Sequence, residues 1–408
     1  MGQVQTKLTA AFGKVNITPA EPEPLQGYDP NRYVADPAAD ILDDLHARVL
    51  LLDDGNSRKL MVSVDCCLTN ETPFQAADPG GVKKKYRHFL NTFPEGTRRA
   101  WGEAAGCPEN AVSVHATHTH SAPEHIGGKY TERISATIRQ LAGRLRPVRI
   151  RAATGQCNVS SNRRPRLQHN DALPVDRTLS VVVFEGEDGT PLGSIINCAV
   201  HPTLLMNPFN RVSSEFVGLA MNELERQNGD HFVSLFIQGF SGDVGPVNHY
   251  RDEKEDTYPK VREMSRKLYA DILQTMEHLR EVDPLPLYSG EKKVSLPTRE
   301  GYFKPAVEVT LHVLGMGELM VFSTSAEVFN GYVQAIRKQV SFPGMLMFSG
   351  IANGYNGYLP TKEAFNDGLG GYEMNTTPYR EEACEIYLRE AAALIGHVQT
   401  EARGNGQA

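Results

Sequence analysis

Residues 46–64 read HARVLLLDDGNSRKLMVSV, and this stretch indicates the fold class. Two apolar runs, at 46–52 and 60–64, flank the dipeptide Asp54-Gly55. Apolar runs of strand length on either side of an Asp-Gly turn are typical of a β-hairpin. We therefore predict two antiparallel strands joined by a tight turn at this point in the chain.

Predicted strands and helices alternate along the rest of the chain. Apolar runs predict strands at 110–119, 179–184, 193–200, 232–237, 306–313 and 318–323. Helical spacing of apolar residues predicts helices at 131–145, 214–227, 260–281, 327–338 and 378–396, with a helix and a connection between 80 and 106. This alternation predicts an α/β protein, a single large layered domain with a mixed sheet. We expect that domain to occupy residues 12–396 and a C-terminal tail to occupy residues 397–408.

The composition argues against several classes of partner. The 408 residues include 42 Lys+Arg and 49 Asp+Glu, which gives a net charge of −7. Binding to a nucleic acid or to an anionic membrane surface requires a basic face. No apolar run approaches the roughly 18 residues that a membrane helix needs. We therefore expect a small-molecule substrate, no nucleic-acid partner and no stable membrane insertion, whereas the sequence does not indicate an oligomeric state.

The cysteines and the N-terminal residues bear on the cellular compartment. The chain has six cysteines and no CxxC motif, and no apolar segment typical of a secretory signal precedes residue 12. Reduced, buried thiols are the ordinary state of cysteines in such a chain. On these grounds we expect a cytoplasmic protein.

The sharpest local feature is the histidine-rich segment 115–120, which reads HATHTH. If the predicted strand continued through it, His118 and His120 would lie on the same face, because side chains alternate along a strand. Neutral imidazole is a favoured zinc ligand, so the pattern favours a metal site at the end of a strand. The alternative is a polar strand end whose histidines make only hydrogen bonds.

Further chemistry-bearing residues follow other predicted apolar strands. His201 follows the strand 193–200 and is compatible with either a metal ligand or a structural cap. The turn 238–246, QGFSGDVGP, contains Asp243 but lacks the Lys and the spacing of a Walker motif, so it is typical of a tight turn rather than of a phosphate loop. The loop 350–360 carries two tyrosines, and Glu327 is expected in the first turn of the helix 327–338.

Taken in order, these segments resemble the catalytic domain of the neutral/alkaline (non-lysosomal) ceramidase family. The resemblance covers about residues 12–396, and no single motif is decisive, but the motifs occur in the family's order. They are Asn16-Ile17-Thr18-Pro19, Gly27-Tyr28, Thr117-His118-Thr119-His120-Ser121-Ala122-Pro123, Asn162-Arg163, Ala199-Val200-His201-Pro202, Gly242-Asp243-Val244-Gly245-Pro246, Ser325-Ala326-Glu327, Asn353-Gly354-Tyr355-Asn356-Gly357-Tyr358 and Gly371-Tyr372-Glu373.

The resemblance implies one catalytic Zn²⁺ per chain and a set of roles for this chain's residues. The implied metal ligands are His118, His201, Glu327 and Tyr358. His120 would do acid/base work beside the metal, and Tyr372 would face the developing oxyanion. The residues implied to hold polar groups of the substrate are Arg163, Asp243, Tyr355 and Glu373.

The sequence departs from the family pattern in segments expected near the entrance to the site. Gly245 replaces a Ser, and Glu124-His125 replaces Gly-Gly. We therefore expect a zinc-dependent amidohydrolase whose N-acyl substrate is smaller and more polar than ceramide. Three alternatives stay open: an ester, lactone or glycosidic substrate at the same zinc centre, a non-catalytic metal-binding relative, and a metal-free phosphate-binding enzyme that uses the turn 239–245.

Overall fold

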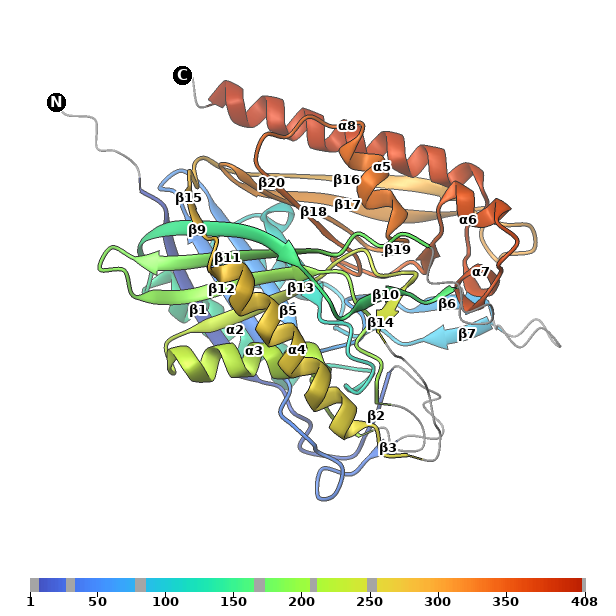
Figure 1. The fold of residues 1–408 in the computed structure, drawn as a ribbon, viewed down its shortest axis with the longest axis horizontal. Coiled ribbons are helices and arrows are strands. Elements are labelled where there is room, and N and C mark those ends of the chain that lie inside the picture. The colour runs from blue at the N-terminus through green and yellow to red at the C-terminus, as the bar shows by residue number, and fades with distance from the viewer. Residues whose placement is uncertain are drawn as a thin grey trace.

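Two mixed β-sheets packed face to face form the centre of the molecule (Figure 1). The structure is a computed structural model, and it describes residues 7–26, 34–77, 86–164, 173–205, 211–247 and 255–405. Helices cover the outer face of each sheet, so the layers follow the order helix, sheet, sheet, helix. The predicted layered α/β domain is confirmed, with two mixed sheets where we expected one. The predicted motif Gly27-Tyr28 lies outside the described residues.

In the described part of the chain, the larger sheet has nine strands in the order β13-β12-β11-β9-β1-β4-β5-β8, with β15 paired to β9. The β5–β8 and β12–β13 pairs are parallel, and the other pairs are antiparallel. The predicted hairpin is the β4–β5 pair. The strands are β1 (Thr9–Asn16), β4 (His46–Asp53), β5 (Arg58–Val64), β8 (Val112–Ala116), β9 (Arg146–Gln156), β11 (Thr178–Gly186), β12 (Pro191–Cys198), β13 (Val233–Gln238) and β15 (Arg280–Val282).

The second sheet has the order β16-β17-β18-β20, in which only β18 and β20 are parallel. Its strands are β16 (Leu287–Pro297), β17 (Ala306–Met316), β18 (Leu319–Thr324) and β20 (Met345–Ser349). Four short pairs complete the strands of the described residues. They are β2 (Glu23–Pro24) with β3 (Val34–Ala35), β6 (Phe74–Ala77) with β7 (Tyr86–Phe89), β10 (Ser160–Asn162) with β14 (Val244–Pro246), and β19 (Glu327–Val328) with β21 (Tyr358–Leu359).

Both faces of the larger sheet are buried, which explains its nearly continuous apolar strands. On β4, Leu50 and Leu52 lie in the core between the two sheets, whereas Val49 and Leu51 lie in the core beneath the helices. Successive strand side chains point to opposite faces, so one apolar run supplies two cores.

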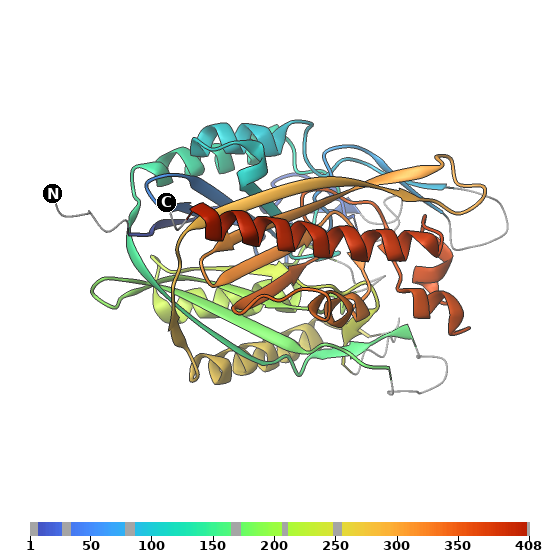
Figure 2. The same ribbon diagram turned by 90° about the horizontal axis from the view of Figure 1, so that it is seen from above.

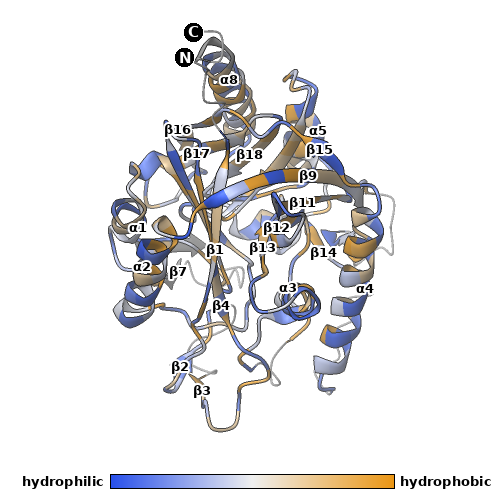
Figure 3. Ribbon diagram, turned by 90° about the vertical axis from the view of Figure 1, so that its left-hand side faces the viewer, coloured by the Kyte–Doolittle hydropathy of each residue, from blue (hydrophilic) through white to orange (hydrophobic). Residues whose placement is uncertain are grey.

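The helices divide into three groups, and Figures 2 and 3 show α8 lying across the second sheet. The first group covers the larger sheet near β1, β4, β5 and β8, and it consists of α1 (Thr97–Ala105) and α2 (Gly128–Ala142). The second group covers the same sheet near β9, β11 and β13, and it consists of α3 (Glu215–Asn228) and α4 (Tyr258–Met276). The third, α5 (Gly331–Arg337) and α8 (Glu382–Asn405), covers the second sheet. The short helices α6 (Lys362–Asn366) and α7 (Tyr372–Thr376) precede α8. Among the helices of the described ranges, none is long and apolar enough to span a membrane.

Three boundaries differ from the prediction in ways that matter for the site or the core. Strand β8 ends at Ala116, two residues before His118. Glu327 lies in strand β19 instead of in the first turn of a helix, because α5 begins only at Gly331. Helix α8 continues through residues 397–405, which we expected to be a tail, since Val398 is buried against the second sheet.

A buried ion network ties the larger sheet to helix α3. Arg48 on β4 is 1% exposed and contacts Glu225 (Nε to Oε1, 2.7 Å) and Asp65 (Nη1 to Oδ2, 3.1 Å). Lys14 also contacts Glu225, at 2.5 Å. Because Asp65 directly follows β5, the network fixes the end of the strand that leads into the candidate site.

We predict that Arg48→Met destabilises the protein strongly, because it leaves two buried carboxylates without their main counter-ion. The expected loss in the free energy of unfolding is about 3–5 kcal/mol. The control is Arg226→Met, which removes an exposed partner of Glu223 on the same helix and should cost at most about 1 kcal/mol. Urea denaturation of both variants measures the difference. Equal losses would contradict the assignment of a stabilising buried network.

Candidate metal centre

His118 is held by the strand next to its own. Its backbone N–H donates to the carbonyl of Cys66 (2.9 Å), which follows the parallel neighbour β5. The residue has φ of 70°, a left-handed conformation that costs a non-glycine residue on the order of 1–3 kcal/mol. The predicted reason for pairing His118 with His120, alternation along a strand, is therefore wrong, because both lie in the turn after β8.

The glycine-rich turn after β13 positions the second histidine and the carboxylate. The backbone N–H of His201 donates to the carbonyl of Val244 at 3.2 Å. A Cβ atom on Gly242 would lie 2.6 Å from the carbonyl oxygen of Glu327, so only glycine permits this close approach. Glu327 also donates its N–H to the carbonyl of Gly357 at 3.0 Å. The predicted tight turn therefore packs closely against the backbone of Glu327 at the site.

Three atoms converge at this point: Nε2 of His118, Nε2 of His201 and Oε1 of Glu327. The two nitrogens are 2.9 Å apart, and the carboxylate oxygen is 3.1 Å from the first and 3.0 Å from the second. All three side chains are at most 2% exposed. The residues come from the ends of β8 and β12 and from β19, which are far apart in the sequence.

The hydrogen bonds on the opposite ring nitrogens decide what these three atoms offer. Nδ1 of His118 donates to the carbonyl of Cys67 (2.7 Å), and Nδ1 of His201 donates to the carbonyl of Ser241 (2.9 Å). Because carbonyl oxygens only accept, each neutral ring has its hydrogen on Nδ1 and a lone pair on Nε2. When both rings are neutral, two lone pairs and a carboxylate oxygen face one another, and the arrangement is repulsive unless a proton or a metal ion lies between them.

The pKa values of His118 and Glu327 also indicate that the site favours positive charge. Burial alone would lower the pKa of His118, but the Cys67 thiol and the Glu327 carboxylate outweigh it and raise that pKa to about 10. Burial, with the positive charge of Arg163, lowers the pKa of His201 to about 3. Burial opposes ionisation of Glu327, yet the two histidines hold the pKa of its carboxyl well below the usual value.

The donor set fits a divalent metal such as zinc. Zn–N and Zn–O bonds of about 2.0–2.2 Å in a tetrahedral site place neighbouring ligand atoms about 3.3 Å apart, close to the separations seen here. Carbonyl acceptors on the second ring nitrogen are the usual partners of metal-binding histidines. A second group of donors, Cys67 with His118 and His120, is less suited to bind a metal. The Cys67 thiol lies 3.7 Å from Nδ1 of His118, and that nitrogen already donates to a carbonyl.

Tyr358, the fourth implied ligand, is the direct neighbour of Glu327 in the β19–β21 pair. Its hydroxyl accepts a hydrogen bond from Nη2 of Arg163 at 3.2 Å. Burial and the Glu327 carboxylate raise the pKa of this hydroxyl, and Arg163 opposes them. The arrangement places Tyr358 beside the three converging atoms, and its role as a ligand stays a prediction.

His120 lies beside the same centre. Its Nε2 is 3.4 Å from Nε2 of His118, and the two rings meet edge to face with centroids 4.8 Å apart. Burial, together with repulsion from a protonated His118, holds the pKa of His120 well below its usual value. This imidazole is therefore neutral when the centre holds no metal.

Tyr355 contacts the centre in a way that the sequence did not suggest. Its hydroxyl donates to Oε2 of Glu327 at 2.7 Å, and the ring of Phe74 packs edge to face against it at 5.0 Å. The bond leaves Oε1 of Glu327 directed at the histidines. Tyr355 was predicted to hold the substrate. In the structure, its hydroxyl orients the carboxylate of Glu327.

The remaining residues predicted to hold substrate form an ion pair and a structural bond. Arg163 Nε and Glu373 Oε1 lie 2.6 Å apart. The carboxylate of Asp243 accepts from the backbone N–H of Asn330 (2.7 Å) and from the side chain of Asn162 (3.0 Å). Both oxygens of Asp243 thus have partners in the chain, and its contact with substrate stays a prediction.

Tyr372 is partly exposed next to Tyr358, whereas Glu124 and His125 contact another segment of the chain. Tyr372 is 46% exposed, and its ring meets that of Tyr358 edge to face at 5.9 Å. Glu124 accepts from the N–H of Leu90 (3.3 Å), and Nδ1 of His125 donates to the carbonyl of Asn91 (2.8 Å). These two side chains, expected near the entrance, are both bonded to residues 90–91.

The sequence analysis missed the residues that orient the ligands. Cys67 and Ser241 do so through their backbone carbonyls, which no residue-type motif can show. One signal was available: Cys67 follows the predicted hairpin strand 60–64, and a parallel neighbour of that strand would end beside it.

The comparisons with known proteins bear on the fold and the family resemblance. No protein-family model matches the chain. Neutral ceramidase from Pseudomonas aeruginosa is 24% identical over 204 residues, which span 42% of this chain and only 30% of that relative. The crystal structure of neutral ceramidase from Pseudomonas aeruginosa has a TM-score of 0.73 at 18% identity and covers 95% of this chain and 74% of that chain. A ceramidase complexed with C2 gives a TM-score of 0.77 at 18% identity, with 97% and 76% coverage. The predicted resemblance to the neutral ceramidases is confirmed, and the chain has their fold.

We predict that His201→Ala loses the bound metal and stays folded, because it removes one of three converging donors. The control is His115→Ala, which removes a buried histidine of the same HATHTH segment whose ring contacts the hydroxyls of Ser113 and Ser349 (2.6 and 2.8 Å). Metal content by mass spectrometry and circular dichroism measure the two properties. A His201 variant that retains the metal content of the wild type would show that the metal binds elsewhere.

We predict that Tyr355→Phe weakens metal binding by about 10–100-fold, since it removes the bond that orients Glu327. The control is Tyr288→Phe, which removes a tyrosine hydroxyl whose partners are the carbonyls of Gly317 and Leu319. Competition with a calibrated zinc chelator measures both affinities. An unchanged affinity in the Tyr355 variant would rule out the orienting role.

Proposed function

We propose that this chain is a zinc-dependent hydrolase that cleaves an amide (N-acyl) bond with water as the nucleophile. The observation that carries the proposal is the convergence of His118, His201 and Glu327 in a protein with the neutral ceramidase fold. Because the sequence match spans 30% of the relative's length, the relative's own substrate is not transferred to this chain.

One zinc ion per chain would be held by His118, His201, Glu327 and Tyr358. Bound there, zinc would polarise a carbonyl and lower the pKa of a water molecule towards neutrality. Structural zinc sites usually close with four Cys or His ligands, whereas the proposed set has two histidines, a carboxylate and a phenol. The two histidines and one carboxylate of this chain therefore favour a catalytic role.

His120 is placed to move the proton. Its neutral imidazole lies 3.4 Å from His118, next to where the attacking water would be deprotonated. Taking that proton and delivering it to the departing nitrogen makes the amine a competent leaving group. A histidine in such a position contributes about 10²–10⁴-fold to the rate.

Arg163, Glu373 and Tyr372 surround Tyr358 on its other side. The Arg163 guanidinium lies between the Tyr358 hydroxyl (3.2 Å) and the Glu373 carboxylate (2.6 Å), which fixes its orientation. The half-exposed Tyr372 next to them is accessible to a bound substrate. A tyrosine hydroxyl aimed at the tetrahedral oxygen can stabilise the transition state by about 3 kcal/mol.

We further propose that the substrate is smaller and more polar than ceramide. The proposal rests on the departures from the family pattern at Gly245 and Glu124-His125. The test is a panel of matched short N-acyl amides, esters, lactones and glycosides, with long-chain ceramide alongside. Preferred turnover of the short amides supports the proposal. Faster cleavage of the matched esters, lactones or glycosides would replace the amide with that bond, and preferred turnover of ceramide would reject the polar substrate.

We predict that Tyr372→Phe binds metal like the wild type and turns over more slowly, by about 100-fold in kcat. The phenolic oxygen is lost, while the ring that meets Tyr358 is kept. The control is Tyr269→Phe, on helix α4. Steady-state kinetics on the best substrate of the panel, beside metal content, separate the two effects. Full activity of the Tyr372 variant would remove this residue from the mechanism.

A further inference from the structure

A cavity of about 490 Å³ lies beside the metal centre and shares the side chain of Tyr355 with it. Its walls come from the segment 69–74, helix α1, strands β16 and β17, the loop that joins them, and the loop 353–356. His118, His120, His201 and Glu327 do not line it. Its volume is typical of a site for a small molecule.

Of the described residues, four carboxylates and three cations line the cavity, and two of the cations are paired with lining carboxylates. Arg98 Nη2 lies 2.5 Å from Glu291 Oε2, and Lys293 Nζ lies 3.3 Å from Glu308 Oε1. Both carboxylate oxygens of Glu71 accept backbone N–H groups, from residues 96 and 98, at 2.7 Å. At these two ion pairs an ionic ligand would meet a like charge next to the opposite one, so the pairs favour a neutral molecule.

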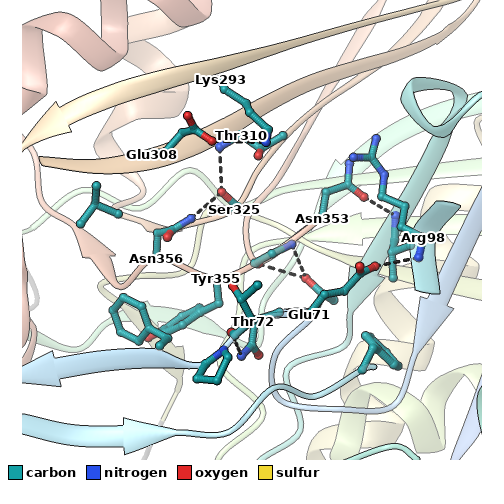
Figure 4. A pocket seen from close by; sticks show the side chains of 18 of the residues that line it. Glu71, Thr72, Arg98, Lys293, Glu308, Thr310, Ser325, Asn353, Tyr355 and Asn356 are labelled. Atoms are coloured by element: carbon teal, nitrogen blue, oxygen red, sulfur yellow. Dashed lines mark hydrogen bonds and ion pairs between the residues drawn. The ribbon is translucent and has the colours of Figure 1, made fainter. Parts of the chain in front are cut away.

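The same lining is rich in groups that bond hydroxyls. Figure 4 shows Lys293, Glu308 and Thr310 on one side of the cavity and Glu71 and Thr72 on the other. The amide of Asn356 and the hydroxyl of Ser325 lie between them. Carboxylates accept and ammonium, amide and hydroxyl groups donate, and a ligand hydroxyl can do both. A molecule with several hydroxyls matches this mixture.

An aromatic pair adds an apolar surface. Tyr302 and Phe303 lie on the loop between β16 and β17, with ring centroids 4.5 Å apart, and Phe303 is 45% exposed. Lys304 Nζ lies over the Phe303 ring, 5.5 Å from its centroid, and the exposed remainder of the ring offers an apolar surface for the C–H groups of a ligand. Sugars carry such C–H faces together with hydroxyls.

The floor of the cavity is preformed. Asn353 exchanges hydrogen bonds with Val114: its N–H donates to the Val114 carbonyl (2.9 Å), and its Oδ1 accepts the Val114 N–H (2.8 Å). Ser325 Oγ accepts from Asn356 Nδ2 (2.9 Å) and from the Thr310 N–H (2.8 Å). A rigid floor reduces the ordering cost of binding.

We propose that this cavity binds a neutral, polyhydroxylated molecule the size of a monosaccharide or disaccharide. Paired charges, hydroxyl-bonding groups and the exposed aromatic face together select this class. The proposal is independent of the hydrolase function, because His118, His201 and Glu327 are not among the residues that line the cavity. Its test therefore measures binding alone.

The experiment is calorimetric titration of the full chain with maltose and N-acetylglucosamine, beside the charged analogues glucuronate and glucosamine. We expect saturable binding of at least one neutral sugar with a Kd of about 1 mM or tighter. The charged analogues should bind at least about tenfold more weakly. No saturation by either neutral sugar, or equal binding of the charged ones, would overturn the proposal.

Two variants locate the binding. Ala306→Trp fills the cavity from β17 and should abolish binding, and Phe303→Ala should weaken it about fivefold by removing the aromatic face. The matched control is Leu273→Ala, which truncates another exposed apolar side chain, on helix α4. Thermal unfolding verifies that each variant is folded. Wild-type binding by a folded Ala306→Trp or by Phe303→Ala would place the sugar elsewhere and reject the site.

Discussion

Three lone pairs that point at one another are the constraint on which the rest of the site depends. Nε2 of His118, Nε2 of His201 and Oε1 of Glu327 lie within 3.1 Å of each other in a buried environment. Such an arrangement is repulsive unless a proton or a metal ion lies between the atoms. Each contact around it serves to hold the donors in place: carbonyls fix the tautomer of both rings, and Tyr355 occupies the second oxygen of Glu327.

The fold supplies this convergence by placing strand ends together. Segments that follow the parallel strands β8, β12 and β20 meet the short strand β19, which brings together residues more than 200 positions apart. Ligand sites in α/β sheets form at the carboxyl ends of strands. Two further features hold the donors in place. The close backbone approach at Gly242 fixes the turn, and the buried charges around Arg48 fix the strand end.

Local patterns in the sequence predicted most elements and the two histidines, whereas contacts between distant segments decided the rest. The hairpin 46–64 is correct because its turn and apolar runs are local signals. The second sheet was not foreseen, since β16 was not predicted and the predicted strands 306–313 and 318–323 look like further strands of one sheet until their packing is known. The position of His118 was inferred from strand alternation, which the left-handed turn breaks. The bond between Tyr355 and Glu327 joins a loop to strand β19, and no local pattern in either segment indicates it.

The most direct test of the central claim is a crystal structure with anomalous diffraction measured on both sides of the zinc absorption edge. The account predicts one strong anomalous peak between His118, His201 and Glu327, with bond lengths of about 2.0–2.2 Å to two Nε2 atoms and one carboxylate oxygen. Zinc-soaked crystals with no peak at this point, and the two histidine nitrogens still about 3 Å apart, would contradict it: the positive charge would then be a proton, and the site would not be a metal centre.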